Sequence, residues 1–242
     1  MILDADEVKR LNAKFETAGA EKVLAWAFGE FPQKIALASS FGAEDVALID
    51  LAVRIDPKVR VFTLDTGRLN EETYEAMDAV RRKYGLAIES YFPNASLVEA
   101  LEREKGFYSF RESVSNRKEC CSIRKVEPLR RALKGLDAWV TGQRREQSVT
   151  RGDLKKIEID EANGGLVKVN PLADWTEAQV WDYVKKNGVP YNRLHDAGYP
   201  SIGCAPCTRA VRPGEDARAG RWWWESPDHK ECGLHPPKKK DV

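Results

Sequence analysis

The strongest constraint on the fold is the alternation of short apolar runs with helical patterns in the first two-thirds of the chain. Buried strands are predicted at 34–40, 59–64, 87–92 and 137–142. Between them, apolar periodicity predicts helices at 43–55, after Asn70, around Leu97 and Leu101, and at 124–133. Strands alternating with helices predict an α/β fold, with a parallel twisted sheet flanked by helices on both faces.

The pattern changes in the last third of the chain. Apolar segments at 156–160 and 166–170 flank an Asn-Gly-Gly sequence, which predicts a β-hairpin. A Thr-x-x-Gln capping box at Thr176 predicts one more helix. The periodicity then fades, so we expect a single α/β domain over 1–242 whose residues 209–242 form an irregular, mobile C-terminal tail.

Composition excludes several classes of protein. The 39 basic and 38 acidic residues leave a net charge of +1, which argues against a nucleic-acid partner or a basic membrane surface. The sequence contains no run of about 18 apolar residues, the length that a helix needs to span a bilayer. The N-terminal sequence lacks the basic-then-apolar order of a signal peptide, so a cytoplasmic location is expected.

Three loops follow predicted strands, where ligands bind in open parallel sheets. The first, at 39–45, combines two hydroxyls, a glycine and a helix N-terminus, which suit an anion. The second, at 64–68, is of the same kind, and the third carries Arg144 and Arg145, with Arg151 close behind. Each loop alone could be an ordinary turn, with Ser40 as a helix cap or the arginines on a solvated face. Three such loops at one sheet edge favour an anion site.

Four of the five cysteines form two close pairs, Cys120-Cys121 and Cys204-x-x-Cys207. Four thiolates can hold zinc or an iron–sulfur cluster, and a vicinal pair favours the cluster. The alternatives are buried small cysteines or a redox disulfide within the second pair. Lys125 follows the first pair closely and could place a positive charge between a cluster and a bound anion, or could be an exposed helical lysine.

The fifth cysteine, Cys232, stands apart near the C-terminus. Lys230, His229 and His235 lie beside it, and such neighbours favour the nucleophilic thiolate. Upstream, Arg218 and Arg221 could neutralise an anionic substrate. The alternative is a spare cysteine on a frayed chain end.

Together these segments resemble the assimilatory adenylyl-sulfate reductases of bacteria, which are related to the 3'-phosphoadenylyl-sulfate reductases and, more distantly, to PP-loop ATP pyrophosphatases. The resemblance rests on SSFGAED, LDTGRL, ECCSIRKVEPL, TGQRREQS, VNPLADWTEAQVWDYV, NRLHDAGYPSIGCAPCTR, GEDARAGRWWWE and KECGLH. SSFGAED stands where PP-loop ATPases have SGGKDS, and the missing glycine pair and lysine argue against ATP cleavage.

The resemblance implies a PP-loop, adenine nucleotide alpha hydrolase-like architecture and a thioredoxin-dependent reduction of adenylyl sulfate to sulfite and AMP in sulfate assimilation. Cys232 would be the nucleophile that forms an S-sulfocysteine. A [4Fe-4S] cluster would be held by Cys120, Cys121, Cys204 and Cys207. A homo-oligomer is also implied. The implied substrate-binding residues are Ser39, Ser40, Phe41, Gly42, Leu64, Asp65, Gly67, Lys125, Arg144, Arg145, Arg151, Arg218 and Arg221.

Three other functions stay open on the sequence alone. One is a reductase of 3'-phosphoadenylyl sulfate, or of both nucleotides. Another is a non-catalytic, metal-binding nucleotide sensor, in which Cys232 would be dispensable. The third is an ATP-cleaving or tRNA-modifying PP-loop enzyme. The missing SGGKDS pattern and the balanced charge both argue against it.

Overall fold

The computed structural model describes residues 3–148, 151–226 and 234. Its chain divides into two compact units, the first formed by 1–63, 71–89 and 133–193, and the second by 64–70, 90–132 and 194–242. The longer elements are α1 (Ala5–Phe15), α2 (Ala20–Glu30), β1 (Ile35–Ala38), α3 (Ala43–Ile55), β2 (Val61–Leu64), α4 (Glu71–Tyr84), β3 (Ile88–Tyr91), α5 (Ala95–Lys105), α6 (Val114–Cys121), α7 (Glu127–Leu133), β4 (Ala138–Val140), β5 (Ile157–Asp160), β6 (Leu166–Val169) and α8 (Glu177–Lys186).

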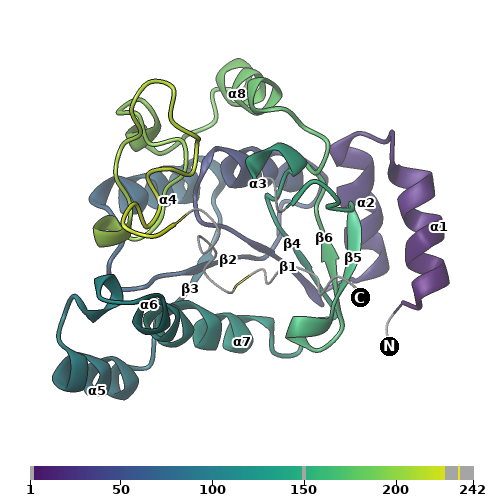
Figure 1. The fold of residues 1–242 in the computed structure, drawn as a ribbon. Helices are drawn as coiled ribbons and strands as arrows, with labels where there is room; N and C mark the ends of the chain where they lie inside the picture. Colours follow the sequence, from purple (N-terminus) through teal and green to yellow (C-terminus); the bar gives the residue numbers. More distant parts are fainter. Residues whose placement is uncertain (1–2, 149–150, 227–233, 235–242) are drawn as a thin grey trace. The chain divides into compact units, whose positions relative to one another are not determined.

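The strands form one six-stranded sheet in the order β3-β2-β1-β4-β6-β5 (Figure 1). The pairs β2–β1, β1–β4 and β4–β6 are parallel, with Leu37 opposite Val61 and Val140 opposite Val169. At one edge, β5 pairs antiparallel with β6, as the Asn-Gly-Gly hairpin signal predicts. The mostly parallel sheet of the predicted α/β class is therefore confirmed.

Elements of strong periodicity lie where the sequence predicts them. Helix α3 occupies 43–55, the predicted range, and Thr176 caps α8 by accepting from the Gln179 N–H. All three residues of β4 are buried, as are the first three of β1 and of β2. Because side chains alternate between the two faces of a strand, both faces of these strands are covered.

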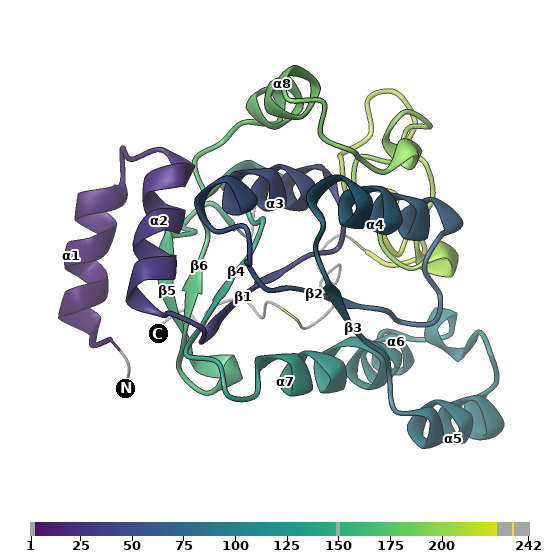
Figure 2. The same ribbon diagram turned by 180° about the vertical axis from the view of Figure 1, so that it is seen from behind.

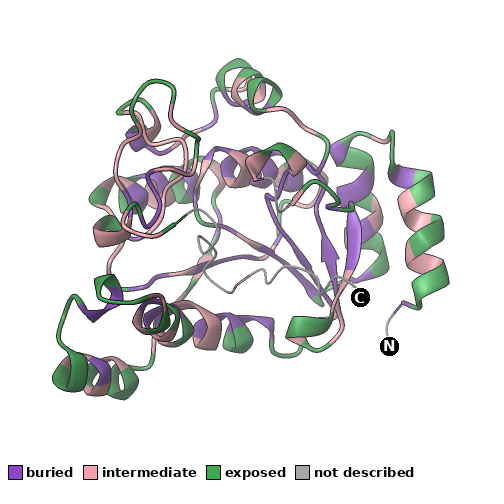
Figure 3. Ribbon diagram, viewed as in Figure 1, coloured by how far each residue is buried: buried purple, intermediate pink, exposed green. Residues whose placement is uncertain are grey.

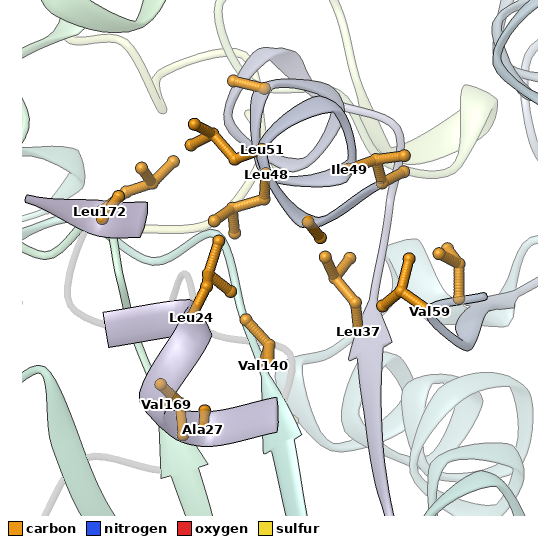
Figure 4. Packing of buried hydrophobic residues seen from close by; sticks show 14 of the residues in the cluster. Leu24, Ala27, Leu37, Leu48, Ile49, Leu51, Val59, Val140, Val169 and Leu172 are labelled. Atoms are coloured by element: carbon orange, nitrogen blue, oxygen red, sulfur yellow. The ribbon is translucent and has the colours of Figure 1, made fainter. Parts of the chain in front are cut away.

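The first unit has one continuous apolar core, built mainly from α2, α3, α8 and the inner strands (Figures 2 and 3). In the close-up, Leu24 of α2, Leu48 of α3, Leu37 of β1 and Val140 of β4 point toward one another (Figure 4). All four are fully buried. Each stabilises the fold by about 1.5–3 kcal/mol relative to an exposed side chain.

A buried carboxylate, Asp50, lies on α3 next to this core. It accepts hydrogen bonds from the hydroxyls of Tyr84 at 2.8 Å and Tyr183 at 2.6 Å. Its charge is balanced by Arg54, whose guanidinium lies 2.8 Å away. Since Tyr84 belongs to α4 and Tyr183 to α8, Asp50 joins three helices, and its burial is compensated by these partners.

In the second unit the predicted helix at 124–133 begins earlier than the sequence indicates. Helix α6 starts at Val114, where the Ser113 hydroxyl accepts from the Asn116 N–H, and a π-helical turn over Ser122–Val126 leads into α7. Pro128 lacks an N–H, so it fits early in α7 after this change of hydrogen-bond register. The Cys120-Cys121 pair therefore lies at the end of a helix.

The tail predicted at 209–242 is described only in part. Residues 209–226 are irregular, with a single bridge between Thr208 and Arg221 and a hydrogen bond from the Arg209 N–H to the Gly220 carbonyl. The expectation of a single domain with a mobile tail stays a prediction. Within the described ranges, no helix is long and apolar enough to cross a membrane.

Candidate functional site

All four paired cysteines line one pocket of the second unit. The pocket is formed by Arg68, Phe110, Arg117, Cys120, Cys121, Arg124, Lys125, Cys204, Cys207, Arg221 and Trp222. The four cysteines are free thiols, so the redox disulfide considered above for Cys204 and Cys207 is absent from this structure. Two pairs that are 83 residues or more apart in the chain thus meet as the cluster hypothesis requires.

Local backbone structure places each pair. Cys120 and Cys121 are the last two residues of α6. Cys204 precedes a short 3-10 turn, Ala205–Cys207, that ends at Cys207, and the Cys207 N–H donates to the Cys204 carbonyl at 2.9 Å. This turn is tied to the loop after β2 by a 2.8 Å hydrogen bond from the Ala205 N–H to the Arg68 carbonyl.

Four cysteine thiols in one pocket are the kind of donor set that holds an iron–sulfur cluster. Among the described residues, no three Cys, His, Asp or Glu side chains are close enough to bind one metal ion. A cluster bonds each thiolate to its own iron, so its ligands lie farther apart than those of one zinc ion. Cys120, Cys121, Cys204 and Cys207 would be the residues that hold it.

Two of the four thiols, Cys120 and Cys207, have pKa values shifted toward the neutral form. Burial raises the pKa of Cys120, against the opposing charges of Arg124 and Arg68. Burial, followed by the nearby Cys204, raises the pKa of Cys207 to about 12, although Lys125 acts in the opposite direction. A metal must displace these protons on binding, because thiolates are the ligands.

Cationic side chains surround the four sulfurs. The Arg124 guanidinium is almost fully buried and donates to the Thr66 carbonyl at 2.8 Å and to Glu102 at 2.6 Å, and its charge favours the Cys120 thiolate. Arg124 follows Cys120 by four residues, which places both on one helical face. The Thr66 hydroxyl lies 3.2 Å from the Cys204 sulfur.

Lys125 lies in the π-helical turn and lines the same pocket, where it is half-buried. Its charge favours the thiolate of Cys207. The alternative of a fully exposed helical lysine is therefore excluded by its position, and an electrostatic function for Lys125 near a cluster fits this structure.

Arg221 reaches the pocket across a glycine. A Cβ at Gly203 would lie 2.4 Å from an Arg221 terminal nitrogen, so only glycine leaves room for this guanidinium. Arg221 also lies over the Trp222 ring, 4.8 Å from its centroid, and one terminal nitrogen donates to the Ile202 carbonyl at 3.2 Å. The predicted residue is thus held firmly beside the cysteines, whereas Arg218 is half-buried outside the pocket lining.

The loop after β2 forms a tight turn in the second unit. The Asp65 carboxylate accepts from the Gly67 N–H at 2.8 Å, and Gly67 has a φ of 71°, which favours glycine. Leu64 is half-buried at the strand end. Leu64, Asp65 and Gly67, three of the predicted substrate-binding residues, therefore share one turn, on which the Thr66 hydroxyl faces the Cys204 sulfur.

The loop after β1 belongs to the first unit and is strained. Phe41 is fully buried and has a φ of 59°, a conformation that costs a non-glycine residue about 1–3 kcal/mol. The Ser39 hydroxyl accepts from the Phe41 N–H at 3.1 Å. The alternative with Ser40 as cap is wrong, because the cap position of α3 is Gly42, without a side-chain hydrogen bond.

Ser40 is instead paired with a carboxylate. Its N–H and its hydroxyl both donate to one Asp45 oxygen, the hydroxyl at 2.7 Å. Burial raises the pKa of Asp45 to about 6, although the Ser40 hydrogen bonds lower it. Gly142 of the loop after β4 packs against this carboxylate so closely that no Cβ would fit. The carboxyl-end loops of two neighbouring strands therefore meet at Asp45.

The arginines after β4 have protein partners in the first unit. Arg144 is buried, with two nitrogens on one Glu44 oxygen at 2.9 and 2.8 Å. Arg145 donates to the Leu154 carbonyl at 2.9 Å and pairs with Glu16 at 3.2 Å. Arg151 donates to Gln147. These contacts exclude the solvated basic face considered above for Arg144.

The predicted nucleophile Cys232 and its neighbours His229, Lys230 and His235 lie outside the described residues. Sequence reasoning also missed Arg117, Arg124, Thr66 and Asp45. A usable signal existed for the two arginines, since Arg117 and Arg124 stand four residues before Cys121 and four after Cys120.

Comparisons with known proteins identify the family of the chain. A phosphoadenosine phosphosulfate reductase domain matches residues 34–210. The adenosine 5'-phosphosulfate reductase of Burkholderia cepacia is 58% identical over 207 residues, which cover 86% of this chain and 82% of that protein. The protein of the same name from Allochromatium vinosum is 55% identical over 83% of this chain and 78% of its own. The Arabidopsis thaliana chloroplastic 5'-adenylylsulfate reductase 3 is 49% identical, and the match covers 97% of this chain and 52% of that protein.

Solved structures give the same result. A Candida auris phosphoadenylyl-sulfate reductase, solved with phosphate, has a TM-score of 0.75 and 31% identity and covers 86% of this chain and 98% of its own. A Candida glabrata FMN adenylyltransferase, at 14% identity and a TM-score of 0.56 over 95% of this chain and 77% of its own, shares the fold alone. From its matched domain and from these relatives, the chain belongs to the phosphoadenosine phosphosulfate reductase family.

Proposed function

We propose that this protein is a cytoplasmic adenylyl-sulfate reductase that releases sulfite and AMP with electrons from thioredoxin. The observation that carries the proposal is the pocket in which four free cysteines meet Lys125, Arg124 and Arg221. The relatives named adenosine 5'-phosphosulfate reductase support adenylyl sulfate as the substrate.

In the proposed reaction, the Cys232 thiolate attacks the sulfur of adenylyl sulfate. An S–S bond forms, the bond from that sulfur to the bridging oxygen breaks, and AMP leaves with the electron pair. One thiolate of thioredoxin then attacks the Cys232 sulfur and sulfite leaves. The second thioredoxin thiol resolves the mixed disulfide, so one dithiol is oxidised for each sulfite formed.

The chain's own residues supply charge and position. Lys125 and Arg221, held at the cysteine pocket, are proposed to stabilise negative charge on the transferred sulfonate and the leaving phosphate. The strained Ser39–Gly42 loop and the Asp65–Gly67 turn are proposed to bind the nucleotide, with Leu64 beside the adenosine. Arg144, Arg145, Arg151 and Arg218 stay candidates for substrate contacts.

The cofactor is proposed to be a [4Fe-4S] cluster on Cys120, Cys121, Cys204 and Cys207. When bound, the cluster acts electrostatically on the substrate site and does not change its redox state. The charge of Arg124 near Cys120 and the hydrogen bond from Arg117 to Cys121 fit this function, because positive charge and hydrogen bonds at the ligand sulfurs stabilise the anionic cluster. A homo-oligomer is expected as well.

The decisive experiment is mass spectrometry of the C-terminal peptide after incubation with adenylyl sulfate but without thioredoxin. We expect one sulfonate on Cys232 and one AMP released per chain, and discharge when thioredoxin is added. The matched control is Cys232→Ser. This variant should bind AMP with the affinity of the wild type but should form no AMP from adenylyl sulfate. AMP release with an unmodified Cys232 would contradict the scheme.

The same assay decides between substrates. Parallel reactions with 3'-phosphoadenylyl sulfate should label Cys232 much more slowly. Equal labelling by both nucleotides would make the protein a dual-substrate enzyme. Full function of Cys232→Ser would indicate the non-catalytic sensor.

A further inference from the structure

One buried ion pair in the second unit is not explained by substrate binding. Arg117, on α6, is fully buried, with 0% of its side chain exposed, and Glu225 is 3% exposed. Their contact is bidentate, with the Arg117 Nε 2.9 Å from one carboxylate oxygen and a terminal nitrogen 2.7 Å from the other. A buried pair of this kind is costly to assemble and strongly destabilising when one partner is removed.

Arg117 has two further partners in the cysteine pocket. Its guanidinium lies over the Trp222 ring, 4.7 Å from the centroid, and it also donates to the Cys121 sulfur. One side chain thus contacts a cysteine of the pocket, the neighbouring aromatic ring and the carboxylate of Glu225. A planar guanidinium with five donors can make all three contacts, which a lysine cannot.

The sequence position of Glu225 gives these contacts a consequence for the reaction. Glu225 lies seven residues before Cys232. Seven residues reach about 25 Å at full extension, so fixing Glu225 limits the volume that the Cys232 thiol can visit. If the pair is broken, the pocket residue nearest to Cys232 is Trp222, ten residues before it, whose N–H donates to the Cys207 carbonyl at 3.1 Å.

We infer that Arg117 is a positioning residue that links the cysteine pocket to the segment bearing Cys232, by holding Glu225 and Trp222 against α6. The inference rests on the function proposed above. In this inference, the Arg117–Glu225 pair fixes the start of the tether, which is the chain between Glu225 and Cys232. From that fixed point the Cys232 thiol reaches the sulfonate. Arg117 acts through Glu225 and Trp222 and touches no reacting atom.

The backbone around Trp222 also requires such a clamp. Trp222 has a φ of 41°, in the left-handed region that a bulky residue rarely adopts, and only 1% of it is exposed. A residue in this conformation persists only where its surroundings hold it there. The flanking guanidiniums of Arg117 and Arg221 lie 4.7 and 4.8 Å from the ring centroid.

The test compares Glu225→Gln with Glu215→Gln in the iron-loaded protein. Glu215 makes a similar bidentate pair with Arg209, at 2.8 and 2.9 Å, but neither residue lines the pocket. The first readout is the rate of tryptic cleavage after Arg221, measured without nucleotide. Cleavage needs local opening, and Arg221 is 7% exposed. We expect Glu225→Gln to accelerate this cleavage about tenfold or more and Glu215→Gln to leave it unchanged.

The second readout is the rate of Cys232 sulfonation by adenylyl sulfate, with iron content and AMP affinity measured on the same samples. Lengthening the tether from seven to ten residues lowers the effective concentration of the thiol, so we expect sulfonation to slow about 1.5- to 2-fold in Glu225→Gln. Iron content and AMP affinity should be unchanged. Arg117→Lys should show the same two changes.

Wild-type cleavage and sulfonation rates in Glu225→Gln would overturn the inference. If that variant does not fold, Glu225→Asp, which keeps the charge on a shorter side chain, is measured in its place by the same criteria. If the wild type itself shows no sulfonation, the proposed function fails, while the tryptic cleavage rates still decide whether Arg117 and Glu225 hold this segment.

Discussion

The two units of the chain differ in how their positively charged side chains are paired. In the first unit, Arg144 is bound to Glu44, and Arg145 to Glu16 and a backbone carbonyl. In the second unit, five cationic residues line the cysteine pocket, while no acidic side chain among the described residues does so. Their acidic partners are Glu102, shared by Arg68 and Arg124, and Glu225.

This difference shows where an anion is needed. Buried charges are stable only when they are paired, so the first unit is largely self-sufficient. The second unit concentrates five cations around four thiols with two carboxylates nearby, which leaves an excess of positive charge. Cysteine thiolates and an anionic ligand would balance this excess. Removing a charged residue from the cysteine pocket is therefore expected to impair function. Removing one from the first unit is expected to lower stability.

The largest effect is expected from removing one cysteine of the pocket. Cys204→Ser should lose bound iron and all sulfite formation, because a serine oxygen replaces a thiolate ligand. Iron and sulfide analysis and the visible absorption of the purified protein measure this. The same variant should keep the far-ultraviolet circular dichroism of the first unit. A colourless wild type containing stoichiometric zinc would contradict the cluster.

Next in size is the effect of Lys125→Ala on turnover. If Lys125 stabilises charge in the transition state, its loss raises the barrier by about 2–4 kcal/mol, as for an oxyanion donor. Stability should change by less than about 1 kcal/mol, since Lys125 is only half-buried. Single-turnover sulfonation measures the effect on turnover, and denaturant unfolding measures the effect on stability. Unchanged kinetics would leave Lys125 without a function at the substrate.

These two predictions test residues that the sequence identified. Periodicity predicted α3 and the buried inner strands, because a buried strand or an amphipathic helix leaves its pattern in neighbouring residues. The spacing of the cysteines in two close pairs predicted that the four side chains lie together. Arg117 and Glu225 could not be paired from the sequence, since they are 108 residues apart and only the fold brings them together.

The helix bearing the cysteine pair was missed for a different reason. Helix α6, with the sequence VSNRKECC, has almost no apolar stripe, so its stability depends on tertiary contacts that no periodicity reports. Likewise, the pairing of Ser40 with Asp45 depends on the strained Phe41, whose positive φ nothing in the sequence announces.

A third prediction examines the self-sufficiency of the first unit. Arg144→Ala leaves Glu44, which is 18% exposed, without its partner and should lower the free energy of unfolding by about 2–3 kcal/mol, less than for a fully buried pair. Arg81→Ala is the control, because the Arg81–Asp78 pair is exposed and should contribute at most about 0.5 kcal/mol. Equal stability of the two variants would contradict the proposed contrast between units.

The smallest effect concerns the carboxylate of Asp45. Burial raises its pKa to about 6, above the ordinary value of 3.8, so between those pH values the folded state binds a proton that the unfolded state has released. Stability therefore falls as the pH rises through this window and stays lower above it. The shift corresponds to at most about 3 kcal/mol, and we expect about 1–2 kcal/mol since Asp45 is only partly covered.

Asp45→Asn removes this penalty and keeps an oxygen that accepts from Ser40. Its stability relative to the wild type should be similar at pH 4 and higher by about 1–2 kcal/mol at pH 7, as measured by urea unfolding. The control is Asp78→Asn, on the exposed surface of α4, for which no such difference with pH is expected. An Asp45→Asn protein that is less stable than the wild type at pH 7 would mean that the charge is needed. Arg151, which lowers the pKa of Asp45, would then be its functional partner, and the first unit would depend on ionic pairing here as it does at Arg144.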